Sequence, residues 1–177
     1  ETDIRDLNLD VIISHDMPSS NETKLVSLSN CFDIFKVDNL KLALNVKSDG
    51  LQKEVFKLIQ EKKIENYFLF DMSIPDTIGY LNLGLNVFCR QSEFEKEVPF
   101  YNQIMGIWLD SFEDIWYNYD TINEHILNGK FVCIVSSELH KRDHISHWEL
   151  LKSWGIHKSS QVILCTDLPE NAKSFFN

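Results

Sequence analysis

Three features of the sequence predict an α/β fold. Short apolar runs rich in β-branched and aromatic residues alternate with helical patterns, which is typical of parallel sheets. Most of the runs end in a polar or charged residue. About seven strand units can be counted, one fewer than a closed ring of eight. We therefore expect a TIM (β/α)8-type barrel that lacks its first strand in this chain, forming a single partial domain over residues 1–177. The nucleotide-binding turns of open α/β sheets, G-x-G-x-x-G and G-x-x-x-x-G-K-[ST], are missing from the sequence.

The strand units follow one another at regular intervals. Residues 1–5 are grouped with the first run to make one unit, and the runs are residues 11–14, 40–46, 67–70, 86–89, 105–109, 131–135 and 162–166. Helices are predicted between them over residues 51–59, 75–83, 121–127, 147–154 and 170–176. Ser73 is the expected N-cap of the second helix, and Gly129 and Gly155 are expected to end the third and fourth. Residues 118–120 and 142–146 are expected to be loops.

Composition limits the partners and the location. The formal net charge is −10, which argues against nucleic-acid and membrane-surface binding because both need basic patches. No stretch is long and apolar enough to predict stable membrane insertion, and no signal peptide is visible. The four cysteines form no C-x-x-C pair, and we expect Cys89, Cys133 and Cys165 to be buried thiols, which suits a cytoplasmic location. The first residues read as the inside of a strand, so residue 1 is interpreted as a cut or processed end. The oligomeric state cannot be inferred.

Polar side chains at strand ends are the candidate site, because chemistry in a parallel barrel gathers where the strands end. The set combines an imidazole, cations and carboxylates: His15, Asp16, Lys47, Asp71, Arg90, Asp110, Glu138 and Asp167. Such a set suits an anionic substrate held by cations and a metal held by carboxylates. The alternative is that these residues are solvated loop starts or structural ion pairs.

Two positions are further candidates for cation binding or acid/base chemistry. Glu1 and Asp3 share one face of a strand, as either a hard-cation site or a pair of surface acids. His15 is either an acid/base group or a structural histidine bonded to Asp16. The other histidines are interpreted as less important: His140, His144 and His147 as a solvated loop group, and His125 and His157 as surface residues.

Four segments resemble the glycerophosphodiester phosphodiesterase family. Glu1-Thr2-Asp3-Ile4-Arg5, followed by His15-Asp16, is similar to the family's E-x-D strand and its His-Asp pair. Leu44-Asn45-Val46-Lys47 resembles its E-x-K motif, and Thr166-Asp167-Leu168-Pro169 its T-D-x-P motif. The order and spacing agree along the whole chain. The phosphatidylinositol-specific phospholipases C share this barrel and similar chemistry.

The resemblance implies metal-assisted hydrolysis of a small phosphodiester, most simply a glycerophosphodiester that yields glycerol phosphate and an alcohol, with Mg²⁺ or Ca²⁺ as cofactor. His15 would be one acid/base, and Lys47 would neutralise phosphate charge. Metal ligands would be Glu1, Asp3, Asn45 and Asp71. Arg90, for its forked guanidinium, and Trp108, from an aromatic-rich segment, are expected to contact the substrate.

Two departures from the family keep other functions open. The family's H-R-G segment would precede Glu1, and Asn45 replaces a carboxylate, which weakens the site for a hard cation unless Asp71 or Asp110 substitutes. One alternative is therefore a catalytically weakened or inactive barrel that binds a phosphorylated ligand. Another is an interaction protein whose partner surface is the aromatic segment of Trp108, Phe112, Trp116, Tyr117 and Tyr119.

Overall fold

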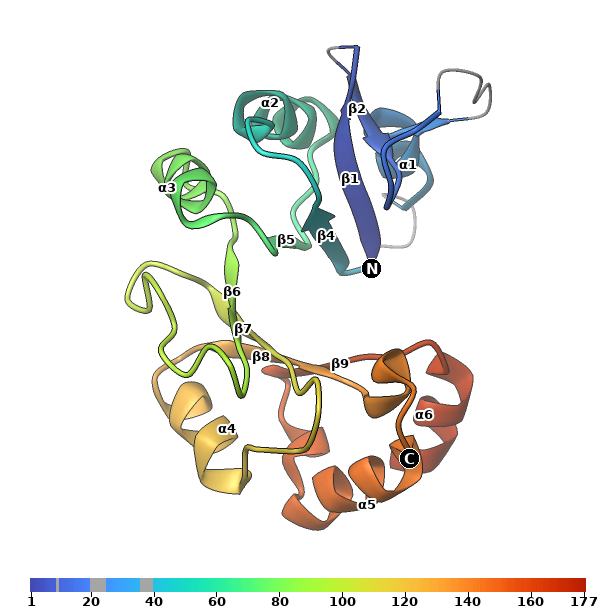
Figure 1. Cartoon of the computed structure of the whole chain (residues 1–177), viewed down its shortest axis with the longest axis vertical. Helices are drawn as coiled ribbons and strands as arrows, with labels where there is room; N and C mark the ends of the chain where they lie inside the picture. Colours follow the sequence, from blue (N-terminus) through green and yellow to red (C-terminus); the bar gives the residue numbers. More distant parts are fainter. Residues whose placement is uncertain (9, 20–24, 36–39) are drawn as a thin grey trace. The chain divides into compact units, whose positions relative to one another are not determined.

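The computed structural model describes residues 1–8, 10–19, 25–35 and 40–177 and divides into two compact units, Glu1–Phe88 and Cys89–Asn177. Each unit contains one sheet with its own helices (Figure 1). The units are described separately below.

The first unit contains a five-stranded sheet in the order β3-β2-β1-β4-β5. Its strands are β1 (Thr2–Leu7), β2 (Asp10–Ile13), β3 (Val26–Ser27), β4 (Leu42–Val46) and β5 (Tyr67–Phe70). Strands β1, β4 and β5 are parallel, whereas β2 runs antiparallel to both β1 and β3. The parallel α/β class predicted from the sequence is therefore confirmed, with an antiparallel addition at one edge.

The grouping of residues 1–5 with residues 11–14 as one strand is wrong. These segments are the two arms of a hairpin, with Ile4 opposite Ile13 and Leu7 opposite Asp10. Asn8, next to the turn, has a φ of 49°, a left-handed conformation that asparagine tolerates better than most residues. The hairpin reverses the chain, so residues 11–14 lead back along β1 instead of extending it.

Parallel strands in this unit are buried on both faces, which is why their sequences read as continuous apolar runs. Leu44 and Leu69 are completely buried, and Phe68 is 2% exposed. The rings of Phe68 and Phe88 stack with their centroids 3.9 Å apart. This stacking packs β5 against Phe88, the last residue of the unit.

Three helices accompany the sheet: α1 (Leu28–Phe35), α2 (Gln52–Lys62) and α3 (Ile74–Asn82). The predicted helices α2 and α3 are present, and Ser73 Oγ accepts a hydrogen bond from Asp76 N as the expected N-cap of α3. Helix α1 was not predicted.

The second unit is a four-stranded sheet in the order β6-β7-β8-β9, with β7, β8 and β9 parallel. Its strands are β6 (Phe88–Gln91), β7 (Gly106–Leu109), β8 (Phe131–Val135) and β9 (Val162–Cys165). Its helices are α4 (Tyr119–Leu127), η1 (Ser137–His140), α5 (His144–Trp154), η2 (Ile156–Lys158) and α6 (Pro169–Phe176). Helices α4, α5 and α6 cover one side of this sheet (Figure 1).

Two segments expected to be loops belong to helices. Asn118 caps α4, where Thr121 N donates to its side chain, and Asp143 caps α5, where it accepts from the backbone N–H groups of Ile145 and Ser146. Both caps are short polar side chains whose oxygen satisfies an unpaired N–H of the first turn. Gly129 lies just after α4, and Gly155, with a φ of 70°, ends α5 as predicted.

Of the three cysteines expected to be buried thiols, Cys89 and Cys133 are buried as predicted, whereas Cys165 is half-buried, so the prediction is wrong for Cys165. Cys31, in helix α1, is buried as well. Over the described part of the chain, every helix is too short or too polar to cross a bilayer.

Candidate functional site

Strand register brings four predicted residues of the first unit together. Asp3 of β1 lies directly opposite Asn45 of β4, and Lys47 N donates to Ile4 O at 2.8 Å. The carboxyl end of β4 therefore lies level with Asp3, near the start of β1. Beyond this point β1 continues as one arm of the hairpin. Glu1, Asp3, Asn45 and Lys47 consequently meet at one edge of the parallel strands.

The Lys47 ammonium lies between two carboxylates. Its Nζ is 3.5 Å from Asp3 Oδ1 and 3.4 Å from Asp71 Oδ2. The Lys47 side chain is 20% exposed, and the two acids are 23% and 26% exposed. Asp71 directly follows β5 with a φ of 71°, a conformation uncommon outside glycine. The cation, which follows β4, is thus held in a partly buried position by one residue of β1 and by the residue after β5.

Asn45 has one satisfied and one unsatisfied polar atom. Its Nδ2 donates to Glu1 Oε1 at 3.3 Å. Asn45 is only 9% exposed, and its Oδ1 is buried without a hydrogen-bond partner among the described residues. Leaving a buried acceptor unpaired costs about 1–3 kcal/mol, so a group that binds this oxygen gains that stabilisation.

The donor chemistry of this cluster fits a hard cation. Over residues 1–8, 10–19, 25–35 and 40–177, no three His, Cys, Asp or Glu side chains gather closely enough to hold an ion. Glu1, Asp3 and the unpaired Asn45 Oδ1 nevertheless provide oxygen donors of the kind that Mg²⁺ and Ca²⁺ prefer. Asp71 is the partner of Lys47, and its role as a metal ligand stays a prediction.

The hairpin of β1 and β2 places His15 near the edge where Glu1, Asp3, Asn45 and Lys47 meet. Ser14 N donates to Asp3 O at 3.1 Å, which places the backbone of the next residue beside the start of β1. The imidazole is 69% exposed, and its Nδ1 lies 2.9 Å from Oδ1 of Asp16, which is 93% exposed. The acid/base role of His15 stays a prediction.

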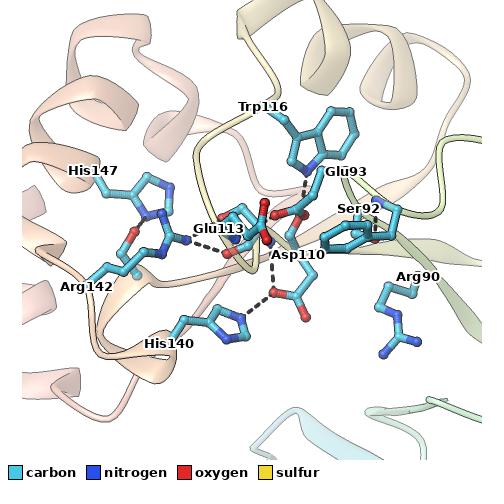
Figure 2. A network of polar contacts seen from close by, with 12 residues as sticks. Arg90, Ser92, Glu93, Asp110, Glu113, Trp116, His140, Arg142 and His147 are labelled. Carbon is cyan, nitrogen blue, oxygen red and sulfur yellow. Dashed lines mark hydrogen bonds and ion pairs between the residues drawn. The ribbon is translucent and has the colours of Figure 1, made fainter.

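A second polar cluster follows β7 and β8 in the other unit (Figure 2). Asp110, 5% exposed, accepts through Oδ1 from Ser111 N at 2.8 Å and pairs with His140 Nε2 at 2.7 Å. Trp116 Nε1 donates to the Asp110 carbonyl oxygen at 2.7 Å, and Arg142 Nη2 donates to the Ser111 carbonyl oxygen and hydroxyl. The loop after β7 is thereby fixed to the segment after β8. Asp110 was expected as a strand-end acid, whereas the interpretation of His140 as a solvated loop residue missed this pair.

The two predicted substrate contacts lie on β6 and β7. Arg90 pairs with Glu95, and its guanidinium carbon is 5.6 Å from the centroid of the Phe112 ring. Trp108 is 7% exposed within β7. Their roles stay predictions. Trp108 and Tyr117 are both buried, so these members of the aromatic segment pack inside the unit and do not form a partner surface.

The T-D-x-P segment has a structural explanation. Glu138 accepts hydrogen bonds from the hydroxyls of Ser136 and Thr166 and from Asp167 N. Burial alone would raise the pKa of the Glu138 carboxyl, but these donors outweigh it and lower the pKa. Pro169 then opens α6, as proline at a first helical position commonly does.

Two histidines interpreted as surface or loop residues are buried. His125 is 6% exposed and lies between Tyr101 and Gln91, while His147 is 3% exposed. His147 contacts the Tyr117 hydroxyl at 2.7 Å and the Ser137 hydroxyl at 3.0 Å. Each ring joins a helix to neighbouring segments, so the sequence interpretation was wrong for both.

Comparison with known proteins supports the fold and leaves the chemistry open. No protein-family model matches the chain, and no curated protein matches its sequence. Its structure is similar to the crystal structure of a "putative glycerophosphodiester phosphodiesterase" from Galdieria sulphuraria, with a TM-score of 0.74 and 14% sequence identity. The match covers 99% of this chain and 84% of the other. The likeness expected from the four sequence segments is thus confirmed at the level of the fold.

Proposed function

We propose that the chain forms a (β/α)8-type barrel that hydrolyses a phosphodiester, most simply a glycerophosphodiester, to glycerol phosphate and an alcohol. The observation that carries the proposal is the Lys47 ammonium between Asp3 and Asp71 at the strand ends. The fold shared with the Galdieria sulphuraria structure gives independent support. Closure of the barrel and a cytoplasmic location are part of the proposal.

Lys47 would act on the charge of the phosphate. Attack by water on phosphorus places negative charge on the non-bridging oxygens, and a fixed cation stabilises that charge without having to reorganise. Asp3 and Asp71 hold Nζ in place from two sides. The ammonium is therefore oriented before the substrate arrives.

The charge of the cluster argues for a second cation. Glu1, Asp3 and Asp71 carry three formal negative charges. Lys47 and Arg5, whose Nη2 donates to Lys47 O at 3.0 Å, carry two positive charges, so the formal side-chain charge of the cluster is −1. Such a cluster repels a phosphodiester anion unless another cation compensates. In the proposal Glu1, Asp3 and Asn45 Oδ1 would hold Mg²⁺ or Ca²⁺, which supplies Lewis-acid stabilisation of the phosphate oxygens when bound.

The test compares Lys47→Met with Lys41→Met in the full-length protein. Lys41 is exposed and precedes β4, at the end of the strand opposite to Lys47. With glycerophosphocholine and Mg²⁺ or Ca²⁺, we expect Lys47→Met to lower kcat about 10²–10³-fold, the usual cost of losing one fixed transition-state donor. Lys41→Met should stay near wild type. Full activity of Lys47→Met, or no turnover by the wild type with either metal, would refute the proposal.

Asn45 favours one alternative, a barrel that binds a phosphorylated ligand without cleaving it. An amide in place of a carboxylate weakens a hard-cation site. Calorimetric titration with glycerol 3-phosphate separates the two functions. Binding that is independent of metal, in a protein that releases no product from glycerophosphocholine, would favour the alternative.

A further inference from the structure

Both backbone polar groups of Lys47 are held by strand β1. The Lys47 N–H donates to Ile4 O at 2.8 Å, and the Lys47 carbonyl oxygen accepts from Arg5 Nη2 at 3.0 Å. The next residue is held by the same strand, because Asp6 N donates to Ser48 Oγ at 3.0 Å. Three consecutive residues of β1 therefore fix the two residues that follow β4, and Arg5 is the one that does so through its side chain.

The part of β1 that carries Arg5 is itself fixed by the hairpin. Arg5 lies opposite Ile12 of β2, so β1 has β2 along one edge and β4 along the other. Asp3 and Arg5 are two residues apart on this strand, and their side chains therefore leave the same face of it. The guanidinium of Arg5 is thus on the face from which Asp3 reaches the Lys47 ammonium.

The Lys47 ammonium depends on a fixed backbone, because its contacts with the two carboxylates are loose. Nζ lies 3.5 Å from Asp3 Oδ1 and 3.4 Å from Asp71 Oδ2, which is longer than charge-assisted hydrogen bonds usually are. The ammonium of a lysine also sits at the end of a flexible stem. The place of Nζ is therefore set largely by the backbone at the base of that stem, which is the part that Arg5 holds.

Stability alone does not explain the guanidinium of Arg5. The residue is half-buried, and its Nε is buried without a hydrogen-bond partner among the described residues. A buried donor left unpaired is unfavourable, and an apolar side chain at the same place would avoid that cost. The guanidinium does form a charge-assisted hydrogen bond to Lys47 O, because arginine stays protonated at any working pH.

We infer that Arg5 is a positioning residue that acts on catalysis through Lys47; this inference rests on the proposed phosphodiesterase function. By holding the Lys47 carbonyl oxygen, Arg5 keeps the ammonium between Asp3 and Asp71, where it meets the charge that develops on the phosphate. Arg5 itself does not contact the phosphate. Its positive charge also reduces the excess of negative charge around Lys47.

The first experiment measures glycerophosphocholine cleavage by variants of the full-length protein with Mg²⁺ or Ca²⁺. We expect Arg5→Met to lower kcat about 10–10²-fold, because a displaced reacting group costs rate steeply, and to leave KM within about threefold of the wild type. Arg5→Lys keeps the charge and a donor, so its kcat should recover to within about threefold. Lys53→Met is the matched control for the loss of one positive charge, since Lys53 is exposed on α2, and it should stay near wild type.

A double-mutant cycle shows whether Arg5 acts through Lys47. In the Lys47→Met background no ammonium is left to be positioned, so adding Arg5→Met should lower kcat further by less than about twofold. An equal loss in the two backgrounds would mean that Arg5 acts independently of Lys47, as a substrate contact or as a structural residue, and it overturns the inference. A loss that falls on KM alone, with kcat unchanged, overturns it as well.

The position of the ammonium can also be measured without substrate, by nitrogen NMR of protein with isotope-labelled lysines. A held ammonium exchanges its hydrogens slowly, so the Lys47 signal should be visible in the wild type and in Arg5→Lys and should weaken in Arg5→Met. Urea unfolding checks that each variant is folded, and Arg5→Gln, which is uncharged and shorter, takes the place of Arg5→Met if that variant does not fold.

The outcomes separate this inference from the proposed function. A Lys47 signal that is invisible in the wild type, or unchanged in the folded Arg5 variant, overturns the positioning role whether or not the protein cleaves the diester. Absence of turnover by the wild type, with the NMR result as expected, overturns the proposed function and the catalytic part of this inference, and leaves Arg5 as the residue that holds Lys47 in place.

Discussion

The stability of the second unit should fall steeply on acidification because of one buried histidine. Burial lowers the pKa of His147 from 6.5 to about 4, with the nearby Arg142 charge adding to the effect. Between the unfolded pKa of 6.5 and the folded pKa of about 4, the unfolded chain binds a proton at His147 and the folded chain does not. The free energy of unfolding therefore decreases as the pH falls through this range. At about 1.4 kcal/mol per pH unit, the full effect is about 3 kcal/mol. Between about pH 7 and about pH 4.5, roughly 2 kcal/mol of it is expressed.

The assay is urea unfolding at both pH values, followed by tryptophan fluorescence, since Trp148 is buried on the same helix. His147→Gln should be less stable at neutral pH, because it disturbs the contacts to Tyr117 and Ser137. The difference between wild type and His147→Gln should then shrink by about 2 kcal/mol at the lower pH. His144→Gln, on the same helix, should keep the wild-type pH dependence. A difference that is independent of pH, or a His147 ring that titrates near its ordinary pKa, would show that this reasoning is wrong.

Two further predictions concern other buried groups. Glu138→Gln should lose about 1–3 kcal/mol of stability at neutral pH, because the carboxylate accepts from Ser136, Thr166 and Asp167 N. Since the folded pKa of Glu138 is lowered, its contribution is complete above the ordinary glutamate pKa of about 4.3 and is lost as pH falls through the folded value. Chemical unfolding at two pH values measures this, and a loss that persists unchanged in acid would contradict it. Burial, with a smaller effect of the Glu95 carboxylate, raises the pKa of the Cys89 thiol to about 11. A thiol reagent at neutral pH should therefore label the half-buried Cys165 well before Cys89, and mass spectrometry of the labelled peptides would show the opposite order if the burial were wrong.

The strands were predictable because burial on both faces leaves a continuous apolar run, as in Phe68, Leu69 and Phe70 of β5. The hairpin of β1 and β2 was not, because two short runs separated by a few polar residues are compatible with either one strand or two. Only the pairing of Ile4 with Ile13 decides between them.

Helix α1 shows a local signal that went unused. Leu28, Cys31, Phe32 and Phe35 follow the spacing of one helical face, and the first three are buried. The capped start of α5 was likewise visible in Asp143, whose oxygens accept from the first turn.

The fate of the histidines could not be predicted, because it depends on neighbours that are distant in sequence. His147 is buried by Tyr117, which lies 30 residues away, and His140 is oriented by Asp110 across the same separation. The sequence shows three histidines close together after a strand, but it does not show that helix α5 turns one inward. Strand-end position was the better guide, since Asp110 and Lys47 both form the contacts expected of such residues.

The two clusters differ in the carboxylates that surround their basic side chains. Around Lys47 the carboxylates outnumber the ammonium, so the phosphate-binding role proposed for Lys47 depends on an added cation. In the second unit Asp110 contacts the His140 imidazole, and Arg90, which lies against the same Phe112 ring as His140, pairs with Glu95. If Lys47 needs the metal, removing it with a chelator should weaken the binding of glycerol 3-phosphate, and calorimetric titration with and without Mg²⁺ measures the difference.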